Sequence, residues 1–252
     1  MLKLFKYNWK MNSMGFYITL TATALLYALL LIGKYRYGWI DDILLAVGFM
    51  IASFSQIIFY IMSAMIFNHG MKSYHRRLIP IKPIQEIAST TLLAVVYSIA
   101  ASVLTTLYFL MADLRFKYEE VNEVISALFE PKAILIIIFF VVWNSISLLS
   151  ILVLAISATY CFRGKYRAWI GILVFFAVQI ITELIMNWLL GEAAENYFAF
   201  IKLEMDNSGN IDHVFDIANI VDFWSLPTLF NVIVIMLQFL ATNYIMKKRI
   251  QL

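Results

Sequence analysis

Six long stretches of this sequence contain no Asp, Glu, Lys or Arg apart from Glu183, and this feature constrains the fold most. They cover residues 11–33, 43–71, 87–112, 133–162, 168–191 and 223–246. A helix that crosses the hydrocarbon core of a bilayer needs about 20 consecutive apolar residues. Runs of Leu, Ile, Val, Phe and Ala without period-two alternation favour helices over a membrane barrel. The sequence therefore predicts an all-α membrane protein.

Composition excludes a water-soluble fold. The chain is 63% hydrophobic and 14% charged, whereas soluble domains are about 45–50% apolar and about 25% charged. We expect a single transmembrane domain over residues 1–252, and its predicted spans are about 16–33, 43–67, 87–112, 133–161, 168–190 and 226–246. The one cysteine, Cys161, allows no intrachain disulfide and no thiolate metal cluster. A net charge of +3 gives no reason to expect a nucleic-acid partner.

The loops between the spans differ in charge, which predicts the orientation. The N-terminus, the second and fourth loops and the C-terminal tail hold 13 of the 19 Lys and Arg residues, and their only acidic residue is Glu86. The alternate loops hold 14 of the 16 Asp and Glu residues. Cytoplasmic loops collect Lys and Arg. Both termini are therefore predicted to be cytoplasmic.

The segment before the first span has an amphipathic pattern. One helical face holds Leu2, Phe5 and Trp9, and the neighbouring face holds Lys3, Lys6 and Lys10. This spacing predicts a helix that lies in the membrane interface, and the alternative is a simple basic anchor. No Ala-x-Ala cleavage site follows the first apolar stretch, so we expect that stretch to be retained.

The loop at residues 68–86 combines basic residues with prolines and aliphatic residues. Pro80 and Pro83 prevent a continuous helix, and Pro83 is suited to the first position of the third span. A purely solvated basic loop has no reason to carry four aliphatic residues. They are Leu78, Ile79, Ile81 and Ile84. The pattern favours docking against another protein, and the alternative is a solvated basic loop.

Two loops on the other side of the membrane are predicted to contain short helices. The loop at 191–225 combines seven acidic residues with several aromatic residues, and a turn cluster at 206–210 divides it. We expect two short helical pieces there, before the sixth span. Residues 113–132 predict another short external amphipathic helix.

Motifs for catalysis are missing from the sequence. It has no HExxH, no Gly-x-Ser-x-Gly and no phosphate-binding Gly-x-x-x-x-Gly-Lys motif, and no metal site is predicted. If ATP drives this protein, another chain must bind the nucleotide.

Polar residues form one stripe on each of two predicted spans. The stripe on the fifth span holds Gln179, Glu183 and Asn187, and the stripe on the second span holds Ser53, Gln56, Tyr60 and Ser63. A carboxylate within a span should face the bundle interior or water. The stripes have two interpretations: hydrogen bonds between helices, or the lining of a pathway. Ala94, Ser98 and Ser102 form a small-residue ridge that predicts close helix packing.

The order of these parts resembles the small permease subunits of type-2 ATP-binding-cassette exporters from Gram-positive bacteria. The resemblance covers the whole chain. It rests on the start Met-Leu-Lys-Leu-Phe-Lys-Tyr-Asn-Trp-Lys at 1–10, on Arg-Arg-Leu-Ile-Pro-Ile-Lys-Pro-Ile at 76–84, and on the large external loop before the sixth span. It implies a bacterial cell membrane location and a dimer with a second copy or a paralogue.

The resemblance also implies contacts with a separate ATPase subunit, which binds ATP and magnesium, so that this chain binds no cofactor itself. The implied ATPase contacts are Phe5, Lys6, Trp9, Lys10, His75, Arg76, Arg77, Leu78, Ile79, Pro80 and Ile81. The implied substrate pathway holds Ser53, Gln56, Tyr60, Gln179, Glu183 and Asn187. An amphipathic peptide or a drug-like molecule is the expected substrate, and membrane lipid is the expected surrounding.

Other functional classes stay open. A secondary transporter or channel could use Glu183 as its proton or ion site, although no span carries paired helix breaks. A membrane enzyme and a non-transporting sensor or assembly partner are the remaining alternatives.

Overall fold

The computed structural model describes residues 2–72, 82–113, 131–162, 165–191, 202–205, 211–214 and 226–249. In these residues the chain forms six α-helices and two short strands. The helices are α1 (Leu2–Tyr37), α2 (Asp41–Lys72), α4 (Pro83–Ala112), α6 (Pro131–Thr159), α7 (Arg167–Leu190) and α10 (Leu226–Arg249). All six are long and apolar enough to cross a membrane. The prediction of six apolar helices is therefore confirmed.

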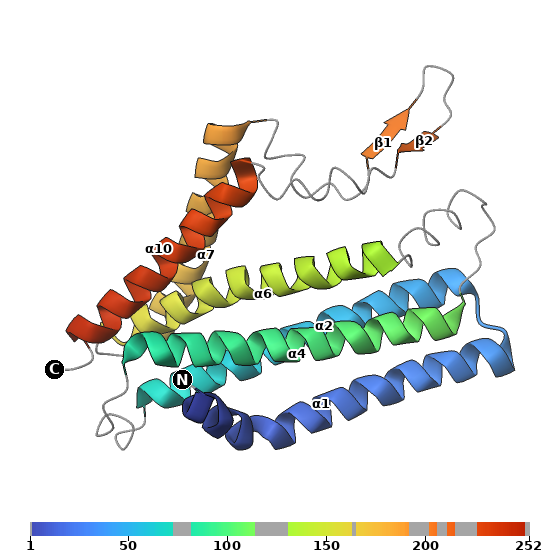
Figure 1. Cartoon of the computed structure of the whole chain (residues 1–252), viewed down its shortest axis with the longest axis horizontal. Helices are drawn as coiled ribbons and strands as arrows, with labels where there is room; N and C mark the ends of the chain where they lie inside the picture. The colour runs from blue at the N-terminus through green and yellow to red at the C-terminus, as the bar shows by residue number, and fades with distance from the viewer. Residues whose placement is uncertain are drawn as a thin grey trace.

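Four helices form a bundle and two diverge from it. Helices α1, α2, α4 and α6 run side by side, whereas α7 and α10 run together at a steep angle to α6 (Figure 1). The starts of α1, α4 and α7 and the ends of α2, α6 and α10 lie at one end of the molecule, with both termini (Figure 1). We call this the basic end, because Lys72, Lys82 and Lys165 are exposed there. The other end of α1, α2 and α4 is called the far end.

Helix α4 lies at the centre of the bundle and α7 at its edge. Helix α4 packs against α1, α2, α6 and α10. Half of the residues in its most apolar stretch are buried, compared with 6% for α7. Gly171 and Met186 are the buried residues of α7. A Cβ on Gly171 would lie 2.5 Å from Cγ2 of Thr159, so the glycine allows α7 to approach α6 closely.

The start of α4 follows the prediction from the sequence. Pro83 is its first residue and Lys82 is the N-cap. Proline suits this position because its ring fixes φ and its missing N–H would have had no partner in the helix. Glu86 in the first turn interacts favourably with the positive end of the helix dipole. Because α2 continues to Lys72, the connection between α2 and α4 is shorter than predicted.

The sequence predicts an N-terminal helix and a separate first span, but the structure has one helix, α1, in their place. It is one element from Leu2 to Tyr37, although its first turns are bent relative to the rest (Figure 1). No proline interrupts it, and Ser13 and Gly15 are residue types that allow a helix to bend without ending. The expected N-terminal segment is therefore continuous with the first span.

The expected short helices before the sixth span do not occur at residues 202–205 and 211–214. Instead β1 (Lys202–Met205) pairs antiparallel with β2 (Ile211–Val214), with Lys202 opposite Val214 and Met205 opposite Ile211. Polar and apolar residues alternate in Lys202–Met205, which is the strand period. The predicted turn cluster at 206–210 lies between the strands in sequence, outside the described residues. The helix expected within 113–132 falls on residues 114–130, which are likewise not described.

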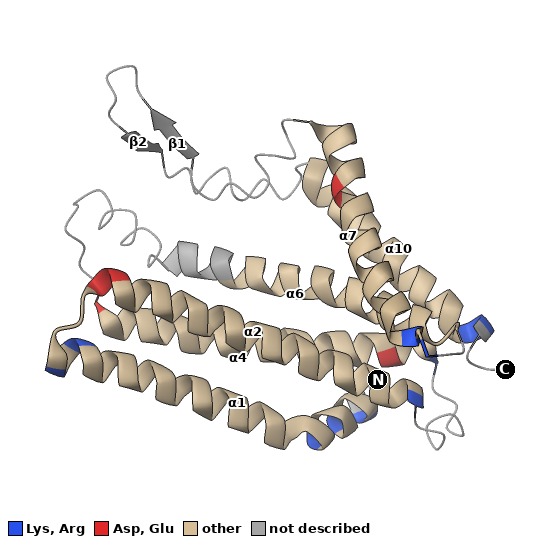
Figure 2. Ribbon diagram, turned by 180° about the vertical axis from the view of Figure 1, so that it is seen from behind, with Lys and Arg blue, Asp and Glu red and all other residues tan. Residues whose placement is uncertain are grey.

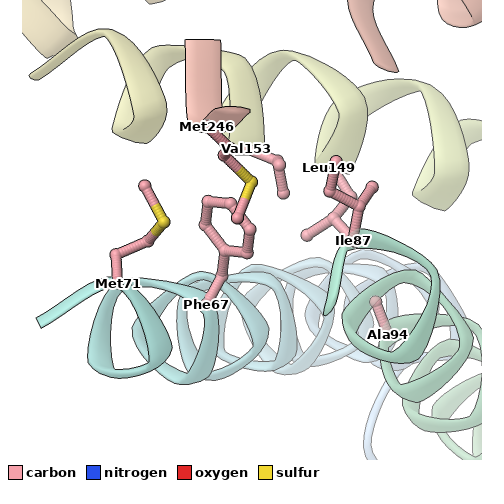
Figure 3. Packing of buried hydrophobic residues seen from close by; sticks show 7 residues of the cluster. All are labelled: Phe67, Met71, Ile87, Ala94, Leu149, Val153 and Met246. Atoms are coloured by element: carbon pink, nitrogen blue, oxygen red, sulfur yellow. The ribbon is translucent and has the colours of Figure 1, made fainter. Parts of the chain in front are cut away.

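A buried cluster joins α10 to the bundle near the basic end (Figure 3). Its members come from α2, α4, α6 and α10, and they are Phe67, Met71, Ile87, Ala94, Leu149, Val153 and Met246. The small side chain of Ala94 leaves room for the larger residues of the facing helices. This packing holds the end of α10 against the bundle.

Candidate functional site

A network of hydrogen bonds joins α2, α4 and α6 in the bundle interior. The hydroxyl groups of Tyr60 and Ser145 are 3.0 Å apart, and Ser145 Oγ donates to Ser98 Oγ at 2.8 Å. Gln56 Nε2 donates to the Ser98 carbonyl at 3.3 Å and to Ser102 Oγ at 3.5 Å. The predicted pathway residues Gln56 and Tyr60 therefore bond to neighbouring helices.

The small-residue ridge of α4 makes this network possible. Ala94, Ser98 and Ser102 are all buried, which confirms the predicted close packing. Ser98 and Ser145 have no exposed surface. Gln56 Oε1 is buried without a hydrogen-bond partner among the described residues. A buried polar atom of this kind is unfavourable by about 1–3 kcal/mol, so Gln56 retains an acceptor for a donor from water or a ligand.

Ser53, the third predicted pathway residue of α2, points away from the bundle interior. Ser53 is exposed, and its hydroxyl donates to the carbonyl of Phe49 in its own helix at 2.9 Å. This bond satisfies the hydroxyl locally, as is common for serine in membrane helices. The polar stripe of α2 is thus divided between the bundle interior and its outer surface.

The stripe on α7 lies on the outer surface of the single chain. Gln179, Glu183 and Asn187 are all exposed, and Gln179 Nε2 donates to Glu183 Oε1 at 3.0 Å. Glu183 lies in the second half of α7, the helix that diverges from the four-helix bundle (Figure 2). The structure does not bring the stripes of α2 and α7 together within one chain. An exposed carboxylate at this depth is unfavourable in lipid, so this face of α7 needs a cover of protein or water.

The apolar face of the N-terminal segment packs on α4 of the same chain. The Trp9 ring centroid lies 5.1 Å from that of Phe16 and 5.8 Å from that of Tyr97. Phe5 is half-buried beside Trp9, with ring centroids 6.3 Å apart. The fully buried Asn8 donates from Nδ2 to Ser89 Oγ at 3.0 Å. Sequence reasoning did not single out Asn8, because a lone asparagine carries no pattern.

The predicted ATPase contacts therefore fall into three groups. Phe5 and Trp9 take part in packing within the chain, whereas Lys6 and Lys10 are exposed. The loop contacts lie outside the described residues, and they are His75, Arg76, Arg77, Leu78, Ile79, Pro80 and Ile81. The residues on either side of this loop are Lys72, at the end of α2, and Lys82, directly before α4, and both are at the basic end.

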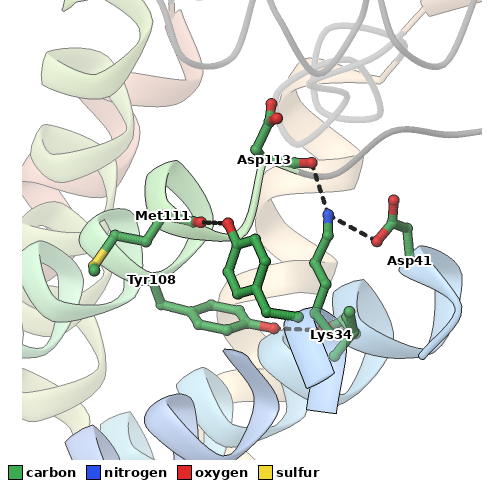
Figure 4. A network of polar contacts seen from close by, with 7 residues as sticks. Lys34, Asp41, Tyr108, Met111 and Asp113 are labelled. Carbon is green, nitrogen blue, oxygen red and sulfur yellow. Dashed lines mark hydrogen bonds and ion pairs between the residues drawn. The ribbon is translucent and has the colours of Figure 1, made fainter. Parts of the chain in front are cut away.

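A second polar cluster, at the far end, joins α1, α2 and α4 (Figure 4). Lys34 Nζ lies 2.9 Å from Asp41 Oδ1 and donates to the Asp113 carbonyl at 2.7 Å. Tyr35 donates its hydroxyl to the Met111 carbonyl at 2.7 Å. Asp113 has φ 42°, a left-handed conformation that ends α4 and is unusual for a non-glycine residue. The Asp113 carbonyl at this helix end accepts the hydrogen bond from Lys34.

The six apolar helices indicate a multi-pass membrane protein. Comparisons of the chain with protein families, curated proteins and solved structures gave no match. Any more specific function therefore depends on the geometry described above.

Proposed function

We propose that this chain is the membrane-spanning permease subunit of an ATP-binding-cassette exporter. It moves an amphipathic substrate, a peptide or a drug-like molecule, out of a bacterial cell with ATP hydrolysed by a separate subunit. The observation that supports this proposal best is the gathering of exposed lysines at one end of the molecule. They are Lys3, Lys6, Lys10, Lys72, Lys82, Lys165, Lys247 and Lys248.

The charge difference between the two ends supports the orientation. Exposed lysines gather at the basic end, while Asp41, Asp42 and Asp113 lie at the far end (Figure 2). Because cytoplasmic segments of membrane proteins collect Lys and Arg, we place the basic end and both termini in the cytoplasm. An ATPase that uses cytoplasmic ATP can bind the chain only there.

The proposed ATPase contact combines the exposed face of the N-terminal segment with the loop between α2 and α4. Lys6 and Lys10 supply charge on the segment, and Arg76 and Arg77 supply charge in the loop. Charges at an interface set orientation and association rate more than affinity, while the aliphatic residues of the loop supply apolar contact. ATP and magnesium belong to the partner, because this chain carries no phosphate-binding motif.

The exposed stripe of α7 supports a dimer. A second copy of the chain, or a paralogue, would cover Glu183 and its bonded neighbour Gln179 and would remove the carboxylate from lipid. The enclosed stripe would then face the substrate path between the two copies. The exposed position of Glu183 in one chain does not favour the alternative of a carrier with a proton site inside its own bundle.

Purification of the tagged chain from its native membrane tests the proposal. We expect an ATPase subunit to copurify in a stoichiometric amount and to hydrolyse ATP. Arg76→Glu with Arg77→Glu should remove the ATPase, because reversed charges add repulsion at the contact. Lys247→Glu with Lys248→Glu is the matched control, with the same charge change at the same end, and should keep the ATPase. Unchanged copurification with the loop variant would contradict the proposed contact.

A further inference from the structure

A cavity of about 390 Å³ lies between α2, α6 and α7 at the basic end. Its walls are mainly apolar and include Ile61 and Met65 of α2 and Ile156 of α6. Asn68, Lys72 and Arg167 line it as well. Ile61 and Lys72 are separated by about 16 Å along α2, at 1.5 Å per residue. The cavity thus joins a cationic region at the helix ends to an apolar region deeper along the helices.

A second apolar groove of about 340 Å³ lies next to this cavity, between α6 and α7. The two share Leu152, Ile156, Thr159 and Ala168 in their walls. The second groove continues past Gly171, where the missing side chain leaves α7 close to α6. The second groove therefore extends the apolar part of the cavity along α6 and α7.

Tyr160 arranges the polar groups of the cavity. Its hydroxyl donates to Asn68 Oδ1 at 2.5 Å, which ties the end of α6 to α2. The guanidinium carbon of Arg167 lies 4.1 Å from the centroid of the Tyr160 ring, which ties the start of α7 to the same residue. A cation over an aromatic face is attracted by the ring quadrupole. Arg167 is therefore held at the cavity while its charge stays available.

We propose that this cavity and the adjoining groove bind an anionic phospholipid, with the phosphate at Lys72 and Arg167 and the acyl chains along α6. Charge complementarity supports this occupant, because Lys72 and Arg167 line the cavity and, among the described residues, no acidic residue lines the cavity or the groove. The apolar walls match acyl chains, and they open towards the lipid phase on the α2 side because Ile61 and Met65 are exposed.

The alternatives fit the walls less well. A small soluble anion would use the cations but would leave both apolar grooves unfilled. A soluble partner protein would cover the helix ends but would not reach the groove beyond Gly171 without entering the hydrocarbon region. The lipid proposal does not depend on the proposed transport function, because the cavity lies within one chain.

Native mass spectrometry of the purified full chain tests the proposal. The chain in detergent is titrated with phosphatidylglycerol or phosphatidylcholine of identical acyl chains, and we expect tighter binding of phosphatidylglycerol. Lys72→Gln with Arg167→Gln should weaken the binding of phosphatidylglycerol roughly 30-fold, because each cation near a lipid phosphate contributes about 1 kcal/mol. Lys247→Gln with Lys248→Gln is the matched control and should change nothing. Equal binding of the two lipids, or equal loss in the two variants, would overturn the proposal.

Two further experiments distinguish a lipid headgroup from free phosphate as the bound group. Ala168→Trp keeps both cations but fills the shared wall, so it should displace the lipid, and thermal unfolding confirms that the variant is folded. Inorganic phosphate should not compete with phosphatidylglycerol. Competition by inorganic phosphate would assign the site to a soluble anion, and lipid binding unchanged by Ala168→Trp would overturn the placement of the acyl chains along α6. Loss of a copurified protein with unchanged lipid binding in the Lys72 and Arg167 variant would assign it to a protein contact.

Discussion

Lys34 Nζ lies 2.9 Å from Asp41 Oδ1, across the short connection between α1 and α2. Both side chains are largely shielded, with 17% and 18% of their surfaces exposed. The same ammonium group donates to the Asp113 carbonyl, at the end of α4. One lysine therefore holds three helix ends together at the far end.

Replacing Lys34 should destabilise the fold. Lys34→Ala removes an ion pair and a hydrogen bond to a carbonyl, so we expect the free energy of unfolding in detergent to fall by about 1.5 kcal/mol. Arg36→Ala is the control, because Arg36 is an exposed cation in the same last turn of α1. Unfolding curves of the two variants measure the difference. Equal stability of both variants would show that the Lys34 contacts contribute nothing.

The interior network should show coupling between Tyr60 and Ser145. Tyr60→Phe keeps the ring and removes the hydroxyl that lies 3.0 Å from Ser145 Oγ. A double-mutant cycle with Ser145→Ala should give a coupling of about 0.6 kcal/mol, the typical size for hydrogen bonds between membrane helices. Unfolding in mixed micelles provides the measurement. Strictly additive effects, with altered export, would instead favour a pathway role for Tyr60.

Variants of the N-terminal segment should distinguish packing within the chain from binding of the ATPase. Trp9→Ala should destabilise the chain by about 2 kcal/mol, because a half-buried indole loses its contacts with Phe16 and Tyr97. Met14→Ala, in the same segment with 75% of its surface exposed, is the stability control. Thermal unfolding of the three proteins makes the comparison.

The exposed lysines of the same segment should behave in the opposite way. Lys6→Glu with Lys10→Glu should keep the stability of the chain and lower the amount of copurified ATPase. If Trp9→Ala removes the ATPase without any loss of stability, the indole is a partner contact after all.

Glu183 should affect the substrate rather than the energy source. Glu183→Gln should keep expression and ATP-dependent export but change the preference for cationic substrates. Glu183→Lys should disrupt assembly, because it places an unpaired cation on an apolar helix. Export from inverted vesicles is measured with and without ATP, and with the proton gradient collapsed. Export that needs the gradient and not ATP would replace the exporter proposal with a carrier.

Cysteine labelling should establish the orientation. In a background without Cys161, Ser73→Cys should react only after the cells are permeabilised, and Ser208→Cys should react in intact cells. The expectation follows from the exposed lysines that gather at the basic end. Labelling of Ser73→Cys from outside would reverse the proposed topology.

Patterns that repeat along the chain were predictable, and single contacts were not. The six helices and the burial of Ala94, Ser98 and Ser102 follow from periodic signals that each involve several residues. The start of α4 at Pro83 follows from the fixed backbone of proline. These features depend on local chemistry, which the sequence displays directly.

The direction in which each polar stripe faces depends on tertiary packing. Gln56 faces Ser98, while Glu183 remains on the outer surface of α7. Both residues look alike in sequence, as polar positions in apolar helices. The contact between Lys34 and Asp113 joins residues far apart in the chain, and no local pattern could reveal it. The hairpin of β1 and β2 had a signal in the alternation of Lys202–Met205 and the turn cluster, which the helical interpretation overlooked.

The missing side chain of Gly171 lets α7 approach α6 closely at Thr159, near the start of α7. The helix is about 35 Å long, it is held near its start, and it diverges from α6 towards Leu190 (Figure 1). A rotation of about 10° around this contact would move the Leu190 end of α7 by about 5 Å, given a rise of 1.5 Å per residue, and α10 would move with it because the two helices run together (Figure 1). A small displacement at the basic end would thus become a larger one at the Leu190 end of α7.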